Sequence, residues 1–214
     1  RQDGRVLKGM ALGHATSNRG ADHLYALATI DLTGNTEVVS RVPELAAAGP
    51  DLMNTISEKD KAVMVRWTEV TNALADMLGI CKFDFTETYA IMPSDLDEGL
   101  QALGIPVSEE ELFRAGQRLV NLERMYNVRH GMSRKDDMLP KRFLEVPLDV
   151  YMHPEDIGEK SPEEAEMIHR GLTVDLDYML DDYYRLGKWT PDGIPTPERL
   201  RELGLDRCIE DLPR

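Results

Sequence analysis

The chain has 214 residues, of which 42% are hydrophobic, and this length and composition are typical of one soluble globular domain. Its 39 acidic and 25 basic side chains give a formal net charge of −14, which repels nucleic-acid phosphates and anionic membrane surfaces, so we expect neither partner. No apolar run approaches the ~18 residues of a membrane-spanning helix, and the start at Arg1, with no apolar signal core and no initiator Met, is expected of the interior of a longer chain.

Helical patterns dominate the first half of the chain. Residues 6–15 are apolar and rich in small side chains, which predicts a buried helix, whereas residues 28–32 alternate and predict a weak strand. The clearest helix is predicted over residues 58–78, with Ser57 as its N-cap and Gly79 ending it. Its expected core stripe, at spacings of three and four, comprises Val63, Trp67, Val70, Leu74 and Met77.

Four further helix starts follow in the second half of the chain. They lie after Ser108, at Ser161, near Leu176 and at Thr196. The helix after Ser108 has a capping box with Glu111. Its expected core face comprises Leu112, Ala115, Leu119, Leu122 and Tyr126. These patterns predict an all-α, multihelical fold, with residues 1–214 as one helical domain.

Four segments differ from generic helical sequence. In residues 13–23, small and polar residues surround two histidines, which suits either a capped helix junction or a site wall with His23 or His14 as a proton donor. In Asp76-Met77-Leu78-Gly79-Ile80-Cys81, a carboxylate lies on the last helical turn, where the helix dipole disfavours it. Cys81 suits either a buried apolar role or a metal-ligating thiolate. Residues 121–129 and 133–143 mix charges, as solvated faces and structural ion-pair networks do.

Taken in order, these segments resemble the C-terminal part of the tungsten-dependent aldehyde:ferredoxin oxidoreductases. The resemblance is carried by residues 15–23, Asp76-x-x-Gly79-Ile80-Cys81, Asn121-Leu122-Glu123-Arg124, Asn127-Val128-Arg129, residues 133–142, residues 176–184 and residues 189–196. It implies the all-α C-terminal domain of that family, with the N-terminal pterin-binding domain and the middle helical domain absent from this sequence.

The resemblance also implies a site. Cys81 would be one ligand of a [4Fe–4S] cluster, and Asp76 would hydrogen-bond the pterin of a tungsten (or molybdenum) bis-pterin cofactor. The backbone of Gly79 and Ile80 would lie close to that pterin. His23 is the best match to the active-site histidine that protonates or orients the substrate oxygen, with His14 in the same stretch as the alternative.

The implied reaction is oxidation of a small aldehyde to a carboxylic acid, with electrons passing through the cluster to ferredoxin. With only two cysteines, Cys81 and Cys208, the sequence lacks the other three cluster ligands, and Cys208 is expected to be structural or incidental. The chain alone is therefore expected to be cofactor-free and inactive, with the remaining domains of a parent enzyme as its partners. Low cysteine use predicts a reducing, cytoplasmic setting. Two alternatives are a related carbonyl or aromatic acyl-CoA oxidoreductase of the same family, and a free-standing, non-catalytic helical module.

Overall fold

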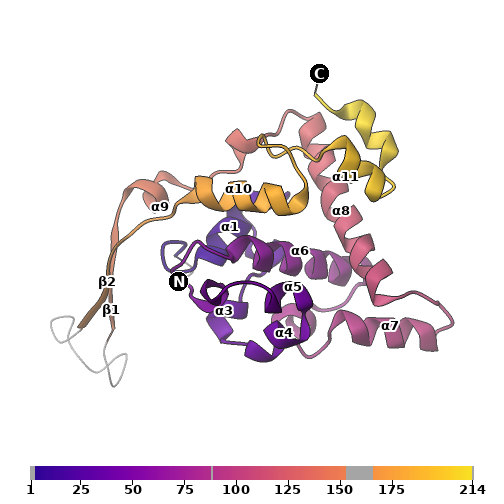
Figure 1. The fold of residues 1–214 in the computed structure, drawn as a ribbon, viewed down its shortest axis with the longest axis horizontal. Helices are drawn as coiled ribbons and strands as arrows, with labels where there is room; N and C mark the ends of the chain where they lie inside the picture. The colour runs from indigo at the N-terminus through magenta and orange to yellow at the C-terminus, as the bar shows by residue number, and fades with distance from the viewer. Residues whose placement is uncertain (1–2, 88, 153–165, 214) are drawn as a thin grey trace.

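A computed structural model describes residues 3–87, 89–152 and 166–213. Figure 1 shows a mostly helical body built around α6 (Lys61–Leu78). The helices α1 (Lys8–Thr16), α8 (Glu109–Arg129) and α10 (Leu176–Gly187) all pack against α6. The expected all-α fold class is therefore confirmed, apart from one small sheet.

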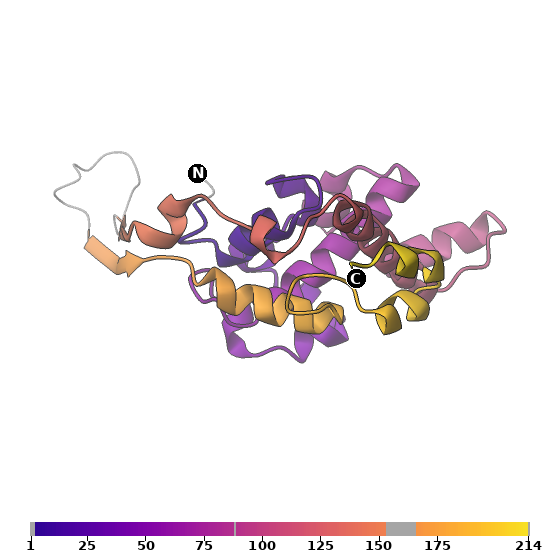
Figure 2. The same cartoon turned by 90° about the horizontal axis from the view of Figure 1, so that it is seen from above.

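The other elements are short. They are α2 (His23–Ala26), α3 (Ile30–Thr33), α4 (Thr36–Arg41), α5 (Pro43–Ala46), α7 (Pro93–Ala102), α9 (Lys141–Glu145) and α11 (Pro197–Glu202), with 3-10 turns at Pro50–Met53, Arg134–Asp136 and Asp206–Asp211 and a π-helical turn at Phe83–Glu87. The strands β1 (Leu148–Met152) and β2 (Glu166–Leu172) pair antiparallel, with Leu148 opposite Leu172. This hairpin projects from one end of the body, while α7 and α11 lie toward the other end (Figures 1 and 2). Within the described ranges, no helix is long and apolar enough to cross a membrane.

The central helix α6 begins three residues later than predicted. Asp60 precedes it in the left-handed conformation, at φ 62°, and the Ser57 side chain accepts the Lys59 N–H in the turn before the helix. Lys61, at the first helical position, is fully buried and places its Nζ 2.8 Å from Asp31 Oδ2. A charged side chain is rarely buried unless it is paired, so this ion pair fixes where α6 starts.

Most of the expected core stripe of α6 is buried. Trp67, Val70 and Leu74 are all buried, whereas Met77 is 52% exposed at the end of the helix. Polar residues on other faces of α6 are buried as well, including Glu69 and Asn72. The helix is thus enclosed on more sides than one apolar stripe predicts.

The capping box of α8 is confirmed, but its expected core face is partly wrong. Ser108 Oγ accepts the Glu111 N–H at 3.2 Å, and the Glu111 carboxylate accepts the Ser108 N–H at 3.0 Å. Leu122 and Tyr126 are exposed, and a neighbouring face is buried instead. That face comprises Leu112, Gly116, Val120, Arg124 and Val128. The buried face of α8 differs from the expected one because it contains an arginine, Arg124, and a glycine, Gly116, which no apolar pattern marks.

One further predicted element is wrong, one falls outside the described residues, and three are confirmed. The expected strand at residues 28–32 does not form: residues 28 and 29 precede α3, and residues 30–32 belong to α3, whose C-cap is Gly34 with φ +65°. The helix start predicted at Ser161 lies outside the described residues, and the segment that the structure describes after it, Glu166–Leu172, pairs with β1 as β2. The predicted helices at residues 6–15, near Leu176 and at Thr196 correspond to α1, α10 and α11.

Candidate functional site

The helix α6 ends in a glycine turn that leads the chain to Cys81. Gly79 has φ +69°, a conformation that favours glycine, and its N–H bonds the Ala75 carbonyl. The Ile80 N–H reaches the same carbonyl at 2.9 Å, and the Ile80 side chain packs against the cluster that contains Leu74. This is a Schellman-type helix end with its hydrophobic contact.

The Cys81 thiol is free and exposed. Large apolar side chains close to it in the chain are exposed too, with Met77 at 52% and Phe83 at 63%. Exposed apolar side chains that gather on a surface mark places where another surface binds. Cys208, in contrast, is half-buried against Met125, Val128 and Leu200.

Asp76 has two cationic partners. Its Oδ2 lies 2.8 Å from Lys82 Nζ and 3.5 Å from an Arg19 guanidinium nitrogen. Lys82 Nζ also donates to the Leu24 carbonyl at 3.0 Å. These contacts join the first two motifs, and they compensate a carboxylate at the negative end of a helix dipole. The Asp76 side chain remains 46% exposed, so its carboxylate keeps capacity for further hydrogen bonds.

His23 and His14 lie close to this junction. His23 is exposed and opens α2, whose N-cap Asp22 accepts the Leu24 N–H and pairs with Arg19 at 2.9 Å. His14 is half-buried on α1. Burial lowers the pKa of His14, and the nearby positive charge of His23 lowers this pKa further. The structure therefore places both histidines in one neighbourhood.

Hydrogen bonds hold the first of the four segments, residues 13–23, against α8. The Asn18 side-chain amide donates to the Tyr25 hydroxyl at 2.7 Å, and that hydroxyl donates to Glu123 at 2.8 Å. Asn127 donates from its side chain to the Asn18 carbonyl at 2.9 Å. A groove of about 450 Å³ lies beside these contacts, and His14 is part of its lining. Segments that are about 100 residues apart in the chain thus form one surface.

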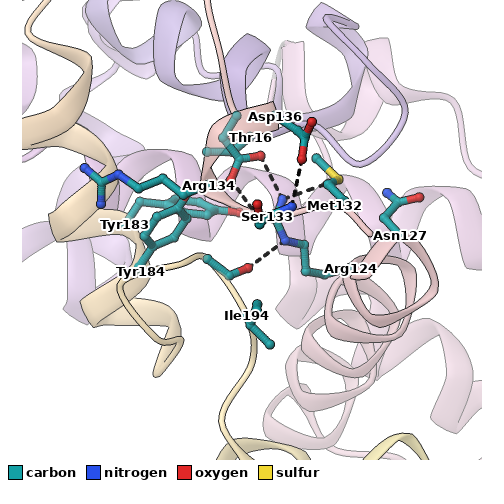
Figure 3. A network of polar contacts seen from close by, with 12 residues as sticks. Thr16, Arg124, Asn127, Met132, Ser133, Arg134, Asp136, Tyr183, Tyr184 and Ile194 are labelled. Atoms are coloured by element: carbon teal, nitrogen blue, oxygen red, sulfur yellow. Dashed lines mark hydrogen bonds and ion pairs between the residues drawn. The ribbon is translucent and has the colours of Figure 1, made fainter. Parts of the chain in front are cut away.

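Arg124 and Asp137, from the third and fourth motifs, form a fully buried pair. Their two hydrogen bonds measure 2.8 and 2.7 Å, and Arg124 Nε donates to the Gly193 carbonyl at 2.8 Å. The Tyr184 hydroxyl also donates to Asp137, and Figure 3 shows Arg124 reaching from α8 toward Tyr184 and Met132. Of the two interpretations of these motifs, the structural ion-pair network applies to this pair.

Sequence reasoning missed Lys82 and the pairing role of Arg19. The available signal was a cation six residues after a carboxylate, just beyond a helix end. Within the described part of the chain, no group of three or more His, Cys, Asp or Glu side chains could hold a metal ion. One exposed thiolate fits a single ligand position of a cluster whose other ligands come from elsewhere. The half-exposed Asp76 carboxylate fits a hydrogen bond to a polar ligand.

Comparisons with known proteins give a consistent result. The family model described as "Aldehyde ferredoxin oxidoreductase, domains 2 & 3" matches residues 1–205. Tungsten-containing aldehyde ferredoxin oxidoreductases of Pyrococcus furiosus and Pyrococcus abyssi are each 33% identical to this chain, over 95% and 97% of it. The match spans 29% of the length of each relative.

One solved structure has a similar fold. It is the active-site complex of a benzoyl coenzyme A reductase bound to 1,5-dienoyl-CoA, with a TM-score of 0.54 and 23% sequence identity. The likeness covers 84% of this chain and 26% of that one.

Proposed function

Because the chain belongs to the aldehyde ferredoxin oxidoreductase family, we propose that residues 1–214 form the helical domain that covers the pterin cofactor of a tungsten (or molybdenum) oxidoreductase. The observation that carries this proposal is the exposed Cys81 thiol directly after the glycine turn of α6. The chain spans about 29% of the relatives' length, so the remaining domains of the parent enzyme would supply the rest of the site.

Each site residue has a proposed task. The Cys81 thiolate ligates one iron of a [4Fe–4S] cluster, and Asp76 accepts a hydrogen bond from the pterin beside the backbone of Gly79 and Ile80. His23, or alternatively His14, holds a proton for the substrate oxygen. Support comes from the contacts that bring the first two motifs together at Asp76.

The proposed reaction is oxidation of a small aldehyde to the carboxylic acid in the cytoplasm. A metal–pterin group bound beside Asp76 would supply two-electron redox chemistry, with water as the oxygen source and two protons released, and a cluster held in part by Cys81 would supply one-electron transfer to ferredoxin. The 33% identity to aldehyde oxidoreductases favours this reaction. Reduction of an aromatic acyl-CoA is the second candidate, because the chain shares a fold with a benzoyl coenzyme A reductase.

The cluster assignment is tested in the intact parent enzyme with two single substitutions, Cys81→Ser and the matched control Cys208→Ser. After reduction, we expect the EPR signal of the [4Fe–4S] cluster to be lost or changed in Cys81→Ser, because serine replaces a thiolate ligand. The signal should be retained in Cys208→Ser, whose thiol is half-buried in an apolar cluster.

An unchanged cluster signal and iron content in Cys81→Ser would contradict the proposal.

The substrate class is tested separately, by assaying the enzyme against a panel of aldehydes and one aromatic CoA thioester. Turnover of the thioester alone would favour the second candidate.

A further inference from the structure

A deep groove lies between α5, α6, α8 and α11. It has an outer part of about 770 Å³ and an inner cavity of about 160 Å³. The two parts share five lining residues: Glu44, Trp67, Phe113, Gln117 and Arg199. None of the residues of the turn at Gly79 lines it. The combined size is in the range of pockets that hold small organic ligands.

The groove has an aromatic floor and two largely buried guanidinium groups, those of Arg199 and Arg66. Trp67 is 6% exposed and Phe113 is half-buried, so aromatic surface faces the space. The Arg199 side chain is 11% exposed, and its Nε is buried with no hydrogen-bond partner among the described residues. A buried donor without an acceptor is costly, and native proteins rarely leave one in place.

The charge of Arg199 is also poorly compensated. Its Nη1 lies 3.3 Å from Glu202, but that carboxylate is shared with Lys188, whose Nζ lies at 2.7 Å. The other inner guanidinium, Arg66, pairs with Glu69 at 2.9 Å. Burial lowers the pKa of Arg199, and the nearby charge of Arg66 lowers this pKa further.

Charges of both signs line the groove, and most of the acidic ones lie on its rim. Glu44, Glu109 and Glu110 line the groove but are exposed, and screening by water weakens their effect at depth. Arg41 and Arg114 also line the outer part, but they are exposed, so water screens their charge as well. The positive charge that could attract an anion is therefore that of the buried Arg199 guanidinium, not that of the groove as a whole.

We propose that the groove binds a small organic monocarboxylate, with its carboxylate on Arg199 and its apolar body on Trp67 and Phe113. A carboxylate would give the Arg199 guanidinium, which lines both parts of the groove, a charge-assisted acceptor, and bonds of this kind are the stronger ones. An apolar body is required because the floor is aromatic, so inorganic anions should bind more weakly. The inference does not depend on the proposed cofactor or on Cys81.

The test uses ¹⁹F NMR of the full 214-residue chain labelled with 5-fluorotryptophan. The sequence has two tryptophans, so Trp67 in the groove and the buried Trp189 report separately. Benzoate should shift the Trp67 resonance saturably and leave Trp189 in place. Benzyl alcohol, which has the same ring and no charge, should bind at least about tenfold more weakly.

Two variants and one control locate the site. Arg199→Met should weaken benzoate binding by about tenfold or more. Arg201→Met, on the exposed face of the same helix, should leave binding unchanged. Gln117→Glu, an isosteric change that places a carboxylate in the groove, should also weaken binding and decides the question if Arg199→Met does not fold. Equal binding of benzoate and benzyl alcohol, no saturable shift, or unchanged affinity in Gln117→Glu would overturn the proposal.

Discussion

At the residue scale, Asp76, which we propose binds the pterin, also has a structural role. A carboxylate on the last turn of a helix is disfavoured by the dipole, and Lys82 at 2.8 Å offsets that cost. The motif of residues 76–81 predicts only that Asp76 contacts a cofactor. It does not predict the ion pair with Lys82, which lies just outside the motif. The path of the chain after Gly79 brings the lysine back toward α6, and the six-residue spacing from Asp76 to Lys82 does not by itself determine that path.

His14 carries the pH dependence of this neighbourhood. In the unfolded chain a histidine binds its proton near pH ~6.5, whereas burial lowers the pKa of His14 in the folded chain. The unfolded state therefore binds more protons just below pH ~6.5, and the free energy of unfolding falls as the pH drops through this window. In urea unfolding at pH 7.5 and 5.5, His14→Gln should lose less stability on acidification than the unsubstituted chain.

The matched control is His130→Gln, at the exposed end of α8. This substitution tests whether the removal of any histidine has the same effect. If the stability of His14→Gln depends on pH as strongly as that of the unsubstituted chain, the statement that burial lowers the pKa of His14 is wrong.

At the scale of elements, the crossing of α6 and α8 depends on Gly116. A Cβ there would lie 2.6 Å from the Val70 carbonyl oxygen and 2.9 Å from Val70 Cγ1. Gly116→Ala should therefore push the helices apart and reduce the free energy of unfolding by about 1–3 kcal/mol. The measurement is chemical denaturation monitored by circular dichroism.

Gly99 in α7 offers the opposite control. Nothing lies within 4 Å of a Cβ added there, so Gly99→Ala should gain about 0.5–1 kcal/mol from helix propensity. A stabilising Gly116→Ala would show that the two helices tolerate a larger separation.

Elements were predictable where the local signal is strong. The α8 cap follows from capping chemistry, and four of the six buried residues of α10 follow from their spacing: Leu176, Met179, Leu180 and Tyr183. The buried face of α8 could not be predicted in this way, because it contains Arg124, which is buried together with its ion-pair partner Asp137, 13 residues further along the chain. The strand β2 could not be predicted either, since it forms by pairing with β1, and both segments have only a weak local preference for strand structure.

At the scale of the whole molecule, the Arg124–Asp137 pair joins α8 to two later segments, through the Gly193 carbonyl and the Tyr184 hydroxyl. Asp137→Ala should cost about 3–5 kcal/mol, because it leaves a buried guanidinium without its counter-charge. Thermal and urea unfolding measure the loss.

The double substitution Arg124→Met with Asp137→Leu should cost less than Asp137→Ala alone, because no unpaired charge stays buried. Lys141→Ala, from an exposed pair at 4.0 Å, should change stability by less than about 1 kcal/mol. A small effect of Asp137→Ala would mean that water replaces the carboxylate.

The two ends of α6 together determine where the Cys81 sulfur lies. The buried Lys61–Asp31 pair fixes one end, and the glycine turn fixes the other, ~27 Å away along 18 helical residues. Because both ends of α6 are fixed, the length of this helix, and not the surrounding loops, determines the position of the thiol. Inserting or deleting one residue within α6 would rotate the thiol by ~100° about the helix axis, whereas changes in loop length elsewhere leave its position unaltered.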